Sequence, residues 1–338
     1  MARRLSLLFT GPRRVELREE ELGPPPPGHV LCRTLASAVS AGTELLAFRG
    51  QLPADTPLDE TLGALGGSTF AYPFRYGYAS VGEVTAVGGG AADRAWVGRR
   101  VFAFEPHASA FVARVEDVQP VPQGTPAEKA ALLAHMETAV NLLLDGAPLY
   151  GERVLVIGQG TVGLLVTALL ARFPLGALVA VEPLPARAEA GRRFGADHVA
   201  AGEEAARHAL GPGGADLVYE LSGDPAALDL AIAAAGHEAR VVVGSWYGGK
   251  RAPVDLGGRF HRRRLRLVSS QVSHIAAALS ARWDRARRFE AAWAALGDVD
   301  TGALVSHRVP FREAQAAYEL LDAHPERVLQ LLLTHPDN

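Results

Sequence analysis

A glycine-rich segment in the middle of the chain has the residue types and spacing of a phosphate-binding turn. Residues 158–163 read GQGTVG, directly after the apolar run Arg153–Ile157 and directly before residues with apolar side chains at helical spacing. A G-x-G-x-x-G motif between a strand and a helix binds a dinucleotide pyrophosphate, because glycine permits the tight turn and the helix N-terminus offers unpaired N–H groups. The alternative is a glycine turn in an α/β protein that binds no ligand. The residues expected to contact the cofactor here are Gly158, Gly160, Thr161, Val162 and Gly163.

An acidic residue follows the next expected strand, at the position where it would bind a ribose. Residues 178–181 form that strand, and Glu182 comes about 20 residues after the glycine motif. Its carboxylate would accept hydrogen bonds from the ribose hydroxyls and repel a 2′-phosphate, so we expect NAD(H) to be the preferred cofactor. Arg187 is either a partner for that phosphate or a solvated helix charge, which keeps NADP(H) as the second choice.

These candidate residues need a parallel sheet to position them, and the sequence predicts one. From about residue 126 onward, short apolar runs alternate with stretches at helical spacing, which is typical of a doubly wound α/β fold. The expected strands are Arg153–Ile157, 178–181, His198–Ala200, 215–219, 239–243 and 265–269. The expected helices of this region are 127–144 with Thr125 as N-cap, one from Thr161, and 187–194.

The two ends of the chain have a different pattern. The first third reads as β-rich, begins with an expected edge strand, and is broken by a proline run and by glycine clusters. The tail mixes an expected helix 284–296, strand 305–309, helix 311–321 and strand 328–333. We expect the tail to pack on the first segment. The predicted domains are a catalytic domain of residues 1–125 and 270–338 and a nucleotide domain of residues 126–269.

The composition excludes several classes of protein. The 338 residues suffice for two domains of roughly 100–200 residues each, and the formal net charge of −3 gives no field that would attract nucleic acid or an anionic membrane. Cys32 is the single cysteine, which excludes an internal disulfide and a thiolate-built zinc lobe. No apolar run fits a signal peptide or the roughly 20 residues of a membrane span. We expect a cytoplasmic protein with a small-molecule substrate and neither a nucleic-acid nor a membrane partner.

Four further segments, in order along the chain, resemble a known family. Residues 41–44 (AGTE) resemble its C-G-T-D turn, and residues 77–84 (GYASVGEV) resemble its G-H-E-x-x-G-x-V segment. Residues 194–199 (FGADHV) and 220–223 (ELSG) resemble segments of its nucleotide domain. Over nearly its full length, the chain resembles the medium-chain dehydrogenase/reductase superfamily of alcohol dehydrogenase-like proteins. The resemblance implies a Rossmann nucleotide domain and a β-rich, GroES-like catalytic domain.

The chain departs from this family where zinc-dependent members bind their metal. The positions that match the zinc ligands hold Ala41, Tyr78 and Ala134, and none of these is a good ligand. The chain therefore resembles a zinc-free branch, in which side-chain donors polarise the reacting oxygen in place of a metal. Residues 41–44 and the missing ligands also resemble the branch that contains bacteriochlorophyllide hydroxyethyl dehydrogenase.

The resemblance supplies three candidate catalytic residues. Thr43 matches a proton-relay hydroxyl, or else it stabilises a turn. Tyr78 would point into the former metal cavity, where it either donates to the substrate or fills the vacated volume. His135, at the start of a helix, is either a general acid or a structural histidine. We expect Glu44 to be a buried structural acid paired with an arginine, and His107 to have a structural role.

The resemblance also implies further contacts. The remaining candidate cofactor residues are Thr138, Ser222, Val243, Gly244, Ser245, Ser269 and Ser270. The candidate substrate residues are Trp246, Tyr247 and Glu137, with a packed loop and a helix cap as the structural alternatives.

The function that the resemblance implies is the reversible interconversion of an alcohol and a carbonyl with NAD(H), without zinc, on a small or cyclic substrate. The alternatives are a quinone or enoyl reductase and a dinucleotide-binding protein without turnover. We also expect a homodimer joined through the strand at 265–269, because Arg266 in an otherwise apolar strand fits the rim of an interface.

Overall fold

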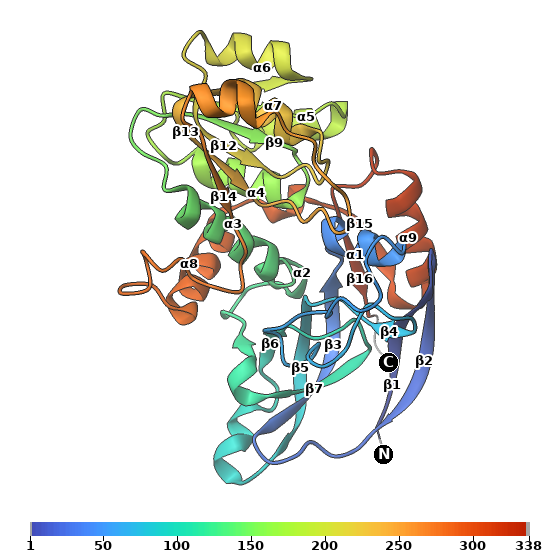
Figure 1. Ribbon diagram of the computed structural model, residues 1–338. Helices are drawn as coiled ribbons and strands as arrows, with labels where there is room; N and C mark the ends of the chain where they lie inside the picture. The colour runs from blue at the N-terminus through green and yellow to red at the C-terminus, as the bar shows by residue number, and fades with distance from the viewer. Residues whose placement is uncertain (1, 336–338) are drawn as a thin grey trace. The chain divides into compact units, whose positions relative to one another are not determined.

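The computed structural model describes residues 2–335, which form two compact units (Figure 1). The first unit contains Met1–Ala134 and Asp300–Asn338, and the second contains His135–Val299. The predicted boundaries after residues 125 and 269 therefore differ from the observed ones. Helix α8 (Arg285–Asp298), expected in the catalytic domain, belongs to the second unit, because its Arg288 forms a buried ion pair with Glu137 of helix α3 (Leu133–Gly146).

The second unit is built on a parallel sheet of six strands in the order β11-β10-β9-β12-β13-β14. The strands are β9 (Arg153–Ile157), β10 (Ala177–Val181), β11 (His198–Ala200), β12 (Ala215–Glu220), β13 (Ala235–Val243) and β14 (Arg266–Ser269). This is the Rossmann order, which reverses between β9 and β12, and ligands of such sheets bind at the carboxyl ends of the strands at that reversal. The predicted doubly wound fold is confirmed.

Four helices of the second unit connect successive strands: α4 (Thr161–Leu170), α5 (Pro185–Arg193), α6 (Glu203–Leu210) and α7 (Ala227–Ala234). A short turn of helix at Leu256–Phe260 lies between β13 and β14, while α3 precedes β9 and α8 follows β14. Apolar side chains of the strands, such as Leu155 and Val241, pack with Leu210 of α6 and Ile232 of α7 in one buried cluster. Burial of this apolar surface holds the carboxyl ends of the strands in fixed positions.

The first unit contains two sheets. In the three-stranded sheet β2-β1-β4, strand β1 (Ala2–Gly11) lies between β2 (Arg14–Leu22) and β4 (Phe74–Arg75), so the prediction of an edge strand was wrong. The second sheet has the order β15-β16-β3-β5-β6-β8, with β7 paired to β3. Its strands are β3 (His29–Ala38), β5 (Ser80–Gly88), β6 (Arg100–Ala103), β7 (Ala110–Arg114), β8 (Gln119–Pro120), β15 (Val305–Pro310) and β16 (Gln330–Thr334). Strand β16 pairs antiparallel with β3, which confirms that the tail packs on the first segment.

The helices of the first unit are α1 (Ala41–Phe48), α2 (Ala127–Ala130) and α9 (Ala314–Ala323), with 3-10 turns at Ala91–Trp96, Val115–Asp117, Thr301–Ala303 and Phe311–Glu313. The segment expected to be a turn is helix α1, because Leu45 and Phe48 bury into the apolar core of this unit. The helix expected over 127–144 is divided into α2 and α3, and α2 begins after Pro126 and not at a Thr125 cap. No helix within residues 2–335 is long and apolar enough to cross a membrane.

Candidate active site

The glycine loop between β9 and α4 has the geometry of a phosphate cradle. Gly158 adopts a φ of +90°, a conformation that residues with side chains rarely adopt, and a Cβ on Gly163 would lie 2.0 Å from the Gly158 carbonyl oxygen. A Cβ on Gly160 would meet nothing within 4 Å, so the space above this residue is open. Helix α4 begins at Thr161 without a side-chain cap, and a helix N-terminus presents backbone N–H donors that favour an anion. The loop therefore fits the pyrophosphate of a dinucleotide.

Glu182 lies at the carboxyl end of β10, as predicted, and is turned toward the glycine loop. Its Oε2 accepts a hydrogen bond from the Gln159 backbone N–H at 2.9 Å, and its Oε1 accepts one from the Leu184 backbone N–H at 2.9 Å. Arg187 lies in the first turn of α5, a few residues beyond. The structure thus bonds the acid directly to the glycine loop.

Gln159 was not predicted as a site residue. Its side chain is fully buried and accepts a hydrogen bond from Thr167 Oγ1 at 3.1 Å, which ties the loop to helix α4. The second position of the glycine motif gives no signal for this role, because any residue is allowed there.

The carboxyl ends of β12, β13 and β14 carry most of the other candidate cofactor residues. Val243 and Ser269 end β13 and β14, Gly244 and Ser245 begin the loop after β13, and Ser222 follows β12. The Ser245 hydroxyl accepts a hydrogen bond from the Gly223 backbone N–H at 2.8 Å, which joins two of these loops. The structure therefore brings these residues to the edge of the sheet where the glycine loop also lies.

A buried polar cluster links α3 to α8 and includes two predicted site residues. Arg288 donates to Glu137 Oε1 through Nε at 3.1 Å and Nη2 at 2.8 Å, and to Asn141 Oδ1 at 2.8 Å. Burial raises the pKa of Glu137, although the charge of Arg288 opposes the rise. Ser270 donates to Asp145 Oδ2 at 2.6 Å, next to the Asn141 amide. Arg288 therefore holds the Glu137 carboxylate in a fixed position, and the substrate contact stays a prediction.

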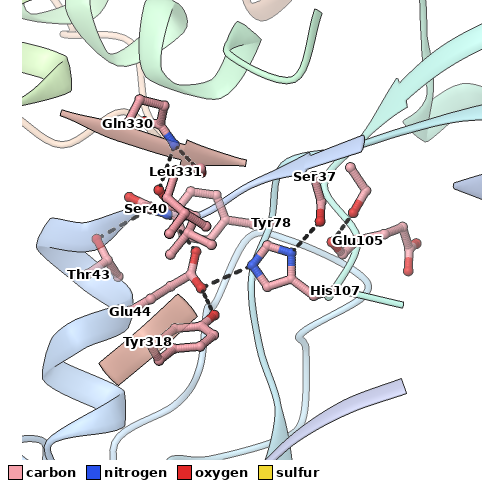
Figure 2. A network of polar contacts seen from close by, with 12 residues as sticks. Ser37, Ser40, Thr43, Glu44, Tyr78, Glu105, His107, Tyr318, Gln330 and Leu331 are labelled. Atoms are coloured by element: carbon pink, nitrogen blue, oxygen red, sulfur yellow. Dashed lines mark hydrogen bonds and ion pairs between the residues drawn. The ribbon is translucent and has the colours of Figure 1, made fainter. Parts of the chain in front are cut away.

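Tyr78 and Thr43, the two predicted donors, lie together in the first unit (Figure 2). The Tyr78 hydroxyl donates to Ser40 Oγ at 2.6 Å and lies 3.3 Å from Thr43 Oγ1, a second acceptor. Burial raises the pKa of Tyr78 to about 12, so the phenol keeps its proton at neutral pH and can act as a donor. We call Ser40, Thr43 and Tyr78 the hydroxyl cluster.

Ser40 was missed by the sequence analysis. It precedes α1, and its backbone carbonyl accepts from the N–H groups of Thr43 at 3.0 Å and Glu44 at 2.8 Å, while its hydroxyl makes no bond to the helix. Its own N–H donates to Glu44 Oε1 at 2.7 Å, which resembles one bond of a capping box, with the acid four residues after the serine in place of three. A serine followed by an acid at the start of a helix was the signal that could have identified this residue.

Glu44 is fully buried, as expected, but the predicted arginine partner was wrong. Its Oε2 lies 3.0 Å from His107 Nε2 and accepts a hydrogen bond from the Tyr318 hydroxyl, and all three side chains are buried (Figure 2). Burial acts to raise the pKa of Glu44, but the positive charge and hydrogen bond of His107 lower it overall. Gly77 makes this pair fit, because a Cβ there would lie 2.4 Å from His107 Cδ2.

The residues that match the zinc-ligand positions offer a poor metal site. Ala41 and Ala134 have no ligand atom, and the Tyr78 oxygen is bonded within the hydroxyl cluster. Within residues 2–335, no group of three or more His, Cys, Asp and Glu side chains is placed to hold a metal ion. Burial and the nearby Glu105 charge raise the pKa of Cys32 to about 12. These three positions therefore supply no imidazole, thiolate or carboxylate ligand for zinc.

His135, the third catalytic candidate, lies in the second unit near the start of α3 and is 5% exposed. Thr138 lies one turn further along the same helix and is half-buried. Trp246 is 41% exposed and follows Ser245 in the loop after β13, whereas the adjacent Tyr247 donates its hydroxyl to Glu220. The Tyr247 hydroxyl therefore has a protein partner, while much of the Trp246 side chain is exposed.

Comparison with known proteins agrees with this fold. The family model described as zinc-binding dehydrogenase matches residues 161–290. D-guloside 3-dehydrogenase of Escherichia coli K12 is 25% identical over 97% of this chain and 99% of the relative, and 2-desacetyl-2-hydroxyethyl bacteriochlorophyllide A dehydrogenase of Cereibacter sphaeroides is 24% identical over 98% of each. A solved structure described as a short chain alcohol dehydrogenase of Escherichia coli CFT073 in complex with NADH superposes with a TM-score of 0.79, at 18% identity, over 99% of this chain and 100% of the other.

The relatives are matched over nearly their whole length, while the family model covers the nucleotide-binding part. The six-stranded sheet order, the glycine loop and the antiparallel β-rich first unit are consistent with these matches. The chain is therefore similar over nearly its full length to these dehydrogenases, and it shares the fold of the solved alcohol dehydrogenase structure.

Proposed function

We propose that this protein is an NAD(H)-dependent oxidoreductase that interconverts an alcohol and a carbonyl. The observation that carries the proposal is the glycine loop at the reversal of the six-stranded sheet, with open space above Gly160 and the Glu182 carboxylate bonded to the Gln159 N–H. Two similar proteins, a D-guloside 3-dehydrogenase and a 2-desacetyl-2-hydroxyethyl bacteriochlorophyllide A dehydrogenase, support this reaction class. The bound nicotinamide would accept or supply the hydride.

The preference for NAD(H) over NADP(H) rests on Glu182. Its carboxylate would accept hydrogen bonds from the ribose hydroxyls of NAD, whereas a 2′-phosphate there would meet a like charge. Arg187 in the first turn of α5 is the group that would moderate this preference.

We propose that the reaction proceeds without zinc, and that Tyr78 and Thr43 supply the polarisation. In the direction of carbonyl reduction, negative charge develops on the substrate oxygen and needs a donor. The hydrogens of the Ser40 and Thr43 hydroxyls can rotate toward the Tyr78 oxygen, which frees the phenol hydrogen for the substrate. The high pKa of Tyr78, about 12, keeps that hydrogen in place at neutral pH.

The substrate class suggested by these features is a small or cyclic hydroxylated molecule. The guloside named for one relative is a cyclic polyhydroxy compound, and the partly exposed Trp246 offers a flat face on which a ring can stack. A quinone or enoyl reductase would use the same cofactor and remains an outcome of the test below.

The test is turnover by metal-depleted protein. We expect NADH-dependent reduction of a ketosugar or cyclic ketone, at a rate that is unchanged by a strong chelator, with less than stoichiometric zinc by elemental analysis. One zinc per chain, together with loss of activity on chelation, would contradict the zinc-free mechanism. Reduction of quinones or enones with no activity on carbonyls would contradict the reaction class, and absence of NADH binding would favour a protein without turnover.

A further inference from the structure

A buried carboxylate joins three segments at the carboxyl edge of the parallel sheet. Glu220 ends β12 and is fully buried. Its Oε1 accepts hydrogen bonds from the Ser222 backbone N–H at 2.8 Å and the Ser222 hydroxyl at 2.5 Å, and its Oε2 accepts one from the Tyr247 hydroxyl at 2.5 Å. A buried acid is costly unless such donors satisfy it, so these three bonds fix the positions of both donor residues.

Glu220 lies at the reversal of strand order, where a dinucleotide would bind. Strand β12 is the neighbour of β9, and Glu220 is in register with Ile157, the residue before the glycine loop. A Cβ on Gly158 would lie 2.7 Å from Ser222 Cα, so the segment held by Glu220 rests directly against the glycine loop. Glu220 therefore fixes a boundary of the phosphate cradle from the β12 side.

On its other side, Glu220 fixes the loop after β13. Its backbone carbonyl accepts hydrogen bonds from the N–H groups of Gly244 at 3.0 Å and Ser245 at 3.2 Å. The Tyr247 hydroxyl, further along this loop, donates a hydrogen bond to the Glu220 carboxylate. Lys250 Nζ donates to the Gly223 carbonyl at 3.1 Å, further along the same loop. Burial and the neighbouring Glu220 raise the pKa of Tyr247, so its hydroxyl stays protonated and remains a donor.

We infer that Glu220 and Tyr247 form a latch that fixes the loop after β13 for the nicotinamide half of the cofactor, with Tyr247 as a positioning residue. The inference rests on the proposed NAD(H)-dependent function. In this strand order, one mononucleotide half of the dinucleotide belongs to β9–β11 and the other to β12–β14. The glycine loop and Glu182 lie in the first half, which takes the adenine nucleotide. The latch lies in the second half.

The experiment compares two ligands on the Tyr247→Phe protein. NADH carries both halves, while ADP-ribose lacks the nicotinamide. We expect the Kd for NADH to rise about tenfold, equivalent to about 1.4 kcal/mol, while the Kd for ADP-ribose changes less than twofold. Both are measured by calorimetry, with thermal unfolding as a check that the variant is folded. The matched control is Tyr150→Phe, which removes a phenol that is 86% exposed and should change neither Kd.

A second variant tests whether Tyr247 acts through Glu220. Glu220→Gln retains one acceptor oxygen but presents an amide NH₂ to one of the two donor residues, so it should also weaken NADH binding. If Glu220→Gln binds NADH as wild type does while Tyr247→Phe is weakened, Tyr247 contacts the ligand directly and the latch is wrong.

The remaining outcomes separate the latch from the proposed function. Unchanged NADH affinity in Tyr247→Phe, or equal weakening of NADH and ADP-ribose, would contradict the latch while the function stands. Failure of the wild-type protein to bind either ligand would contradict the proposed function, and the latch with it.

Discussion

Tyr78→Phe is the substitution that tests the proposed catalytic donor most directly. It removes one hydroxyl and keeps the ring, which packs edge-on against Tyr76 at 6.1 Å between centroids. The structural cost is the 2.6 Å hydrogen bond to Ser40 and the weaker contact with Thr43, a net loss of about 1 kcal/mol in the free energy of unfolding. The Tyr78→Phe variant should therefore still fold.

The effect on catalysis should be much larger than the effect on stability. A donor that stabilises charge in the transition state contributes about 10²–10³ in kcat, so Tyr78→Phe should lower kcat by that factor. Thr43→Val keeps the β-branched shape and should have a smaller effect than Tyr78→Phe, because the Tyr78 hydroxyl keeps its stronger partner Ser40. The assay is NADH oxidation with a carbonyl substrate, and the Kd for NADH is the control and should not change.

The pH dependence provides an independent check. Because the pKa of Tyr78 is raised to about 12, the phenol is protonated at all pH values well below 12. Titration of Tyr78 should therefore cause no change in the rate of carbonyl reduction through the neutral pH range. If Tyr78→Phe and Thr43→Val both retain kcat within a few-fold, the donor lies elsewhere. His135 would then be the next candidate for the acid.

Two further predictions concern the cofactor and the assembly. NADH should bind more tightly than NADPH by about tenfold or more, because the 2′-phosphate would lie against the Glu182 carboxylate. Glu182→Gln should reduce this difference in affinity. Equal affinities in a fluorescence titration of the wild type would mean that a base such as Arg187 compensates. We also propose a homodimer joined through β14, which ends the six-strand order and exposes 39% of Leu267. Light scattering should give twice the monomer mass, and Leu267→Lys should yield monomers; a monomeric wild type would refute the dimer.

The sequence by itself determined the features that depend on neighbouring residues. The predicted bounds of β9 and β11 and the start of α4 at Thr161 agree with the structure, because apolar runs and glycine positions encode backbone conformation locally. The doubly wound sheet followed from the alternation of such runs. The position of Glu182 followed from its place directly after a strand whose neighbour carries the glycine loop.

The resemblance to a family added the pairing of Tyr78 with Thr43, which no local pattern indicates. These residues are 35 positions apart, and the structure confirms that they lie together. It did not supply Ser40, the partner with the shorter hydrogen bond, since the family motif begins one residue later.

Only the tertiary structure decided the partners of the buried charges. Glu44 is hydrogen-bonded to His107 and Tyr318, which are 63 and 274 residues away in the sequence. Glu137 is hydrogen-bonded to Arg288, which is 151 residues away. Such pairs form where the chain returns to the same place after many turns and strands, so neither periodicity nor spacing encodes them. A buried acid must find some donor, and the sequence shows that the acid exists. Which donor satisfies it depends on the packing of the surrounding core.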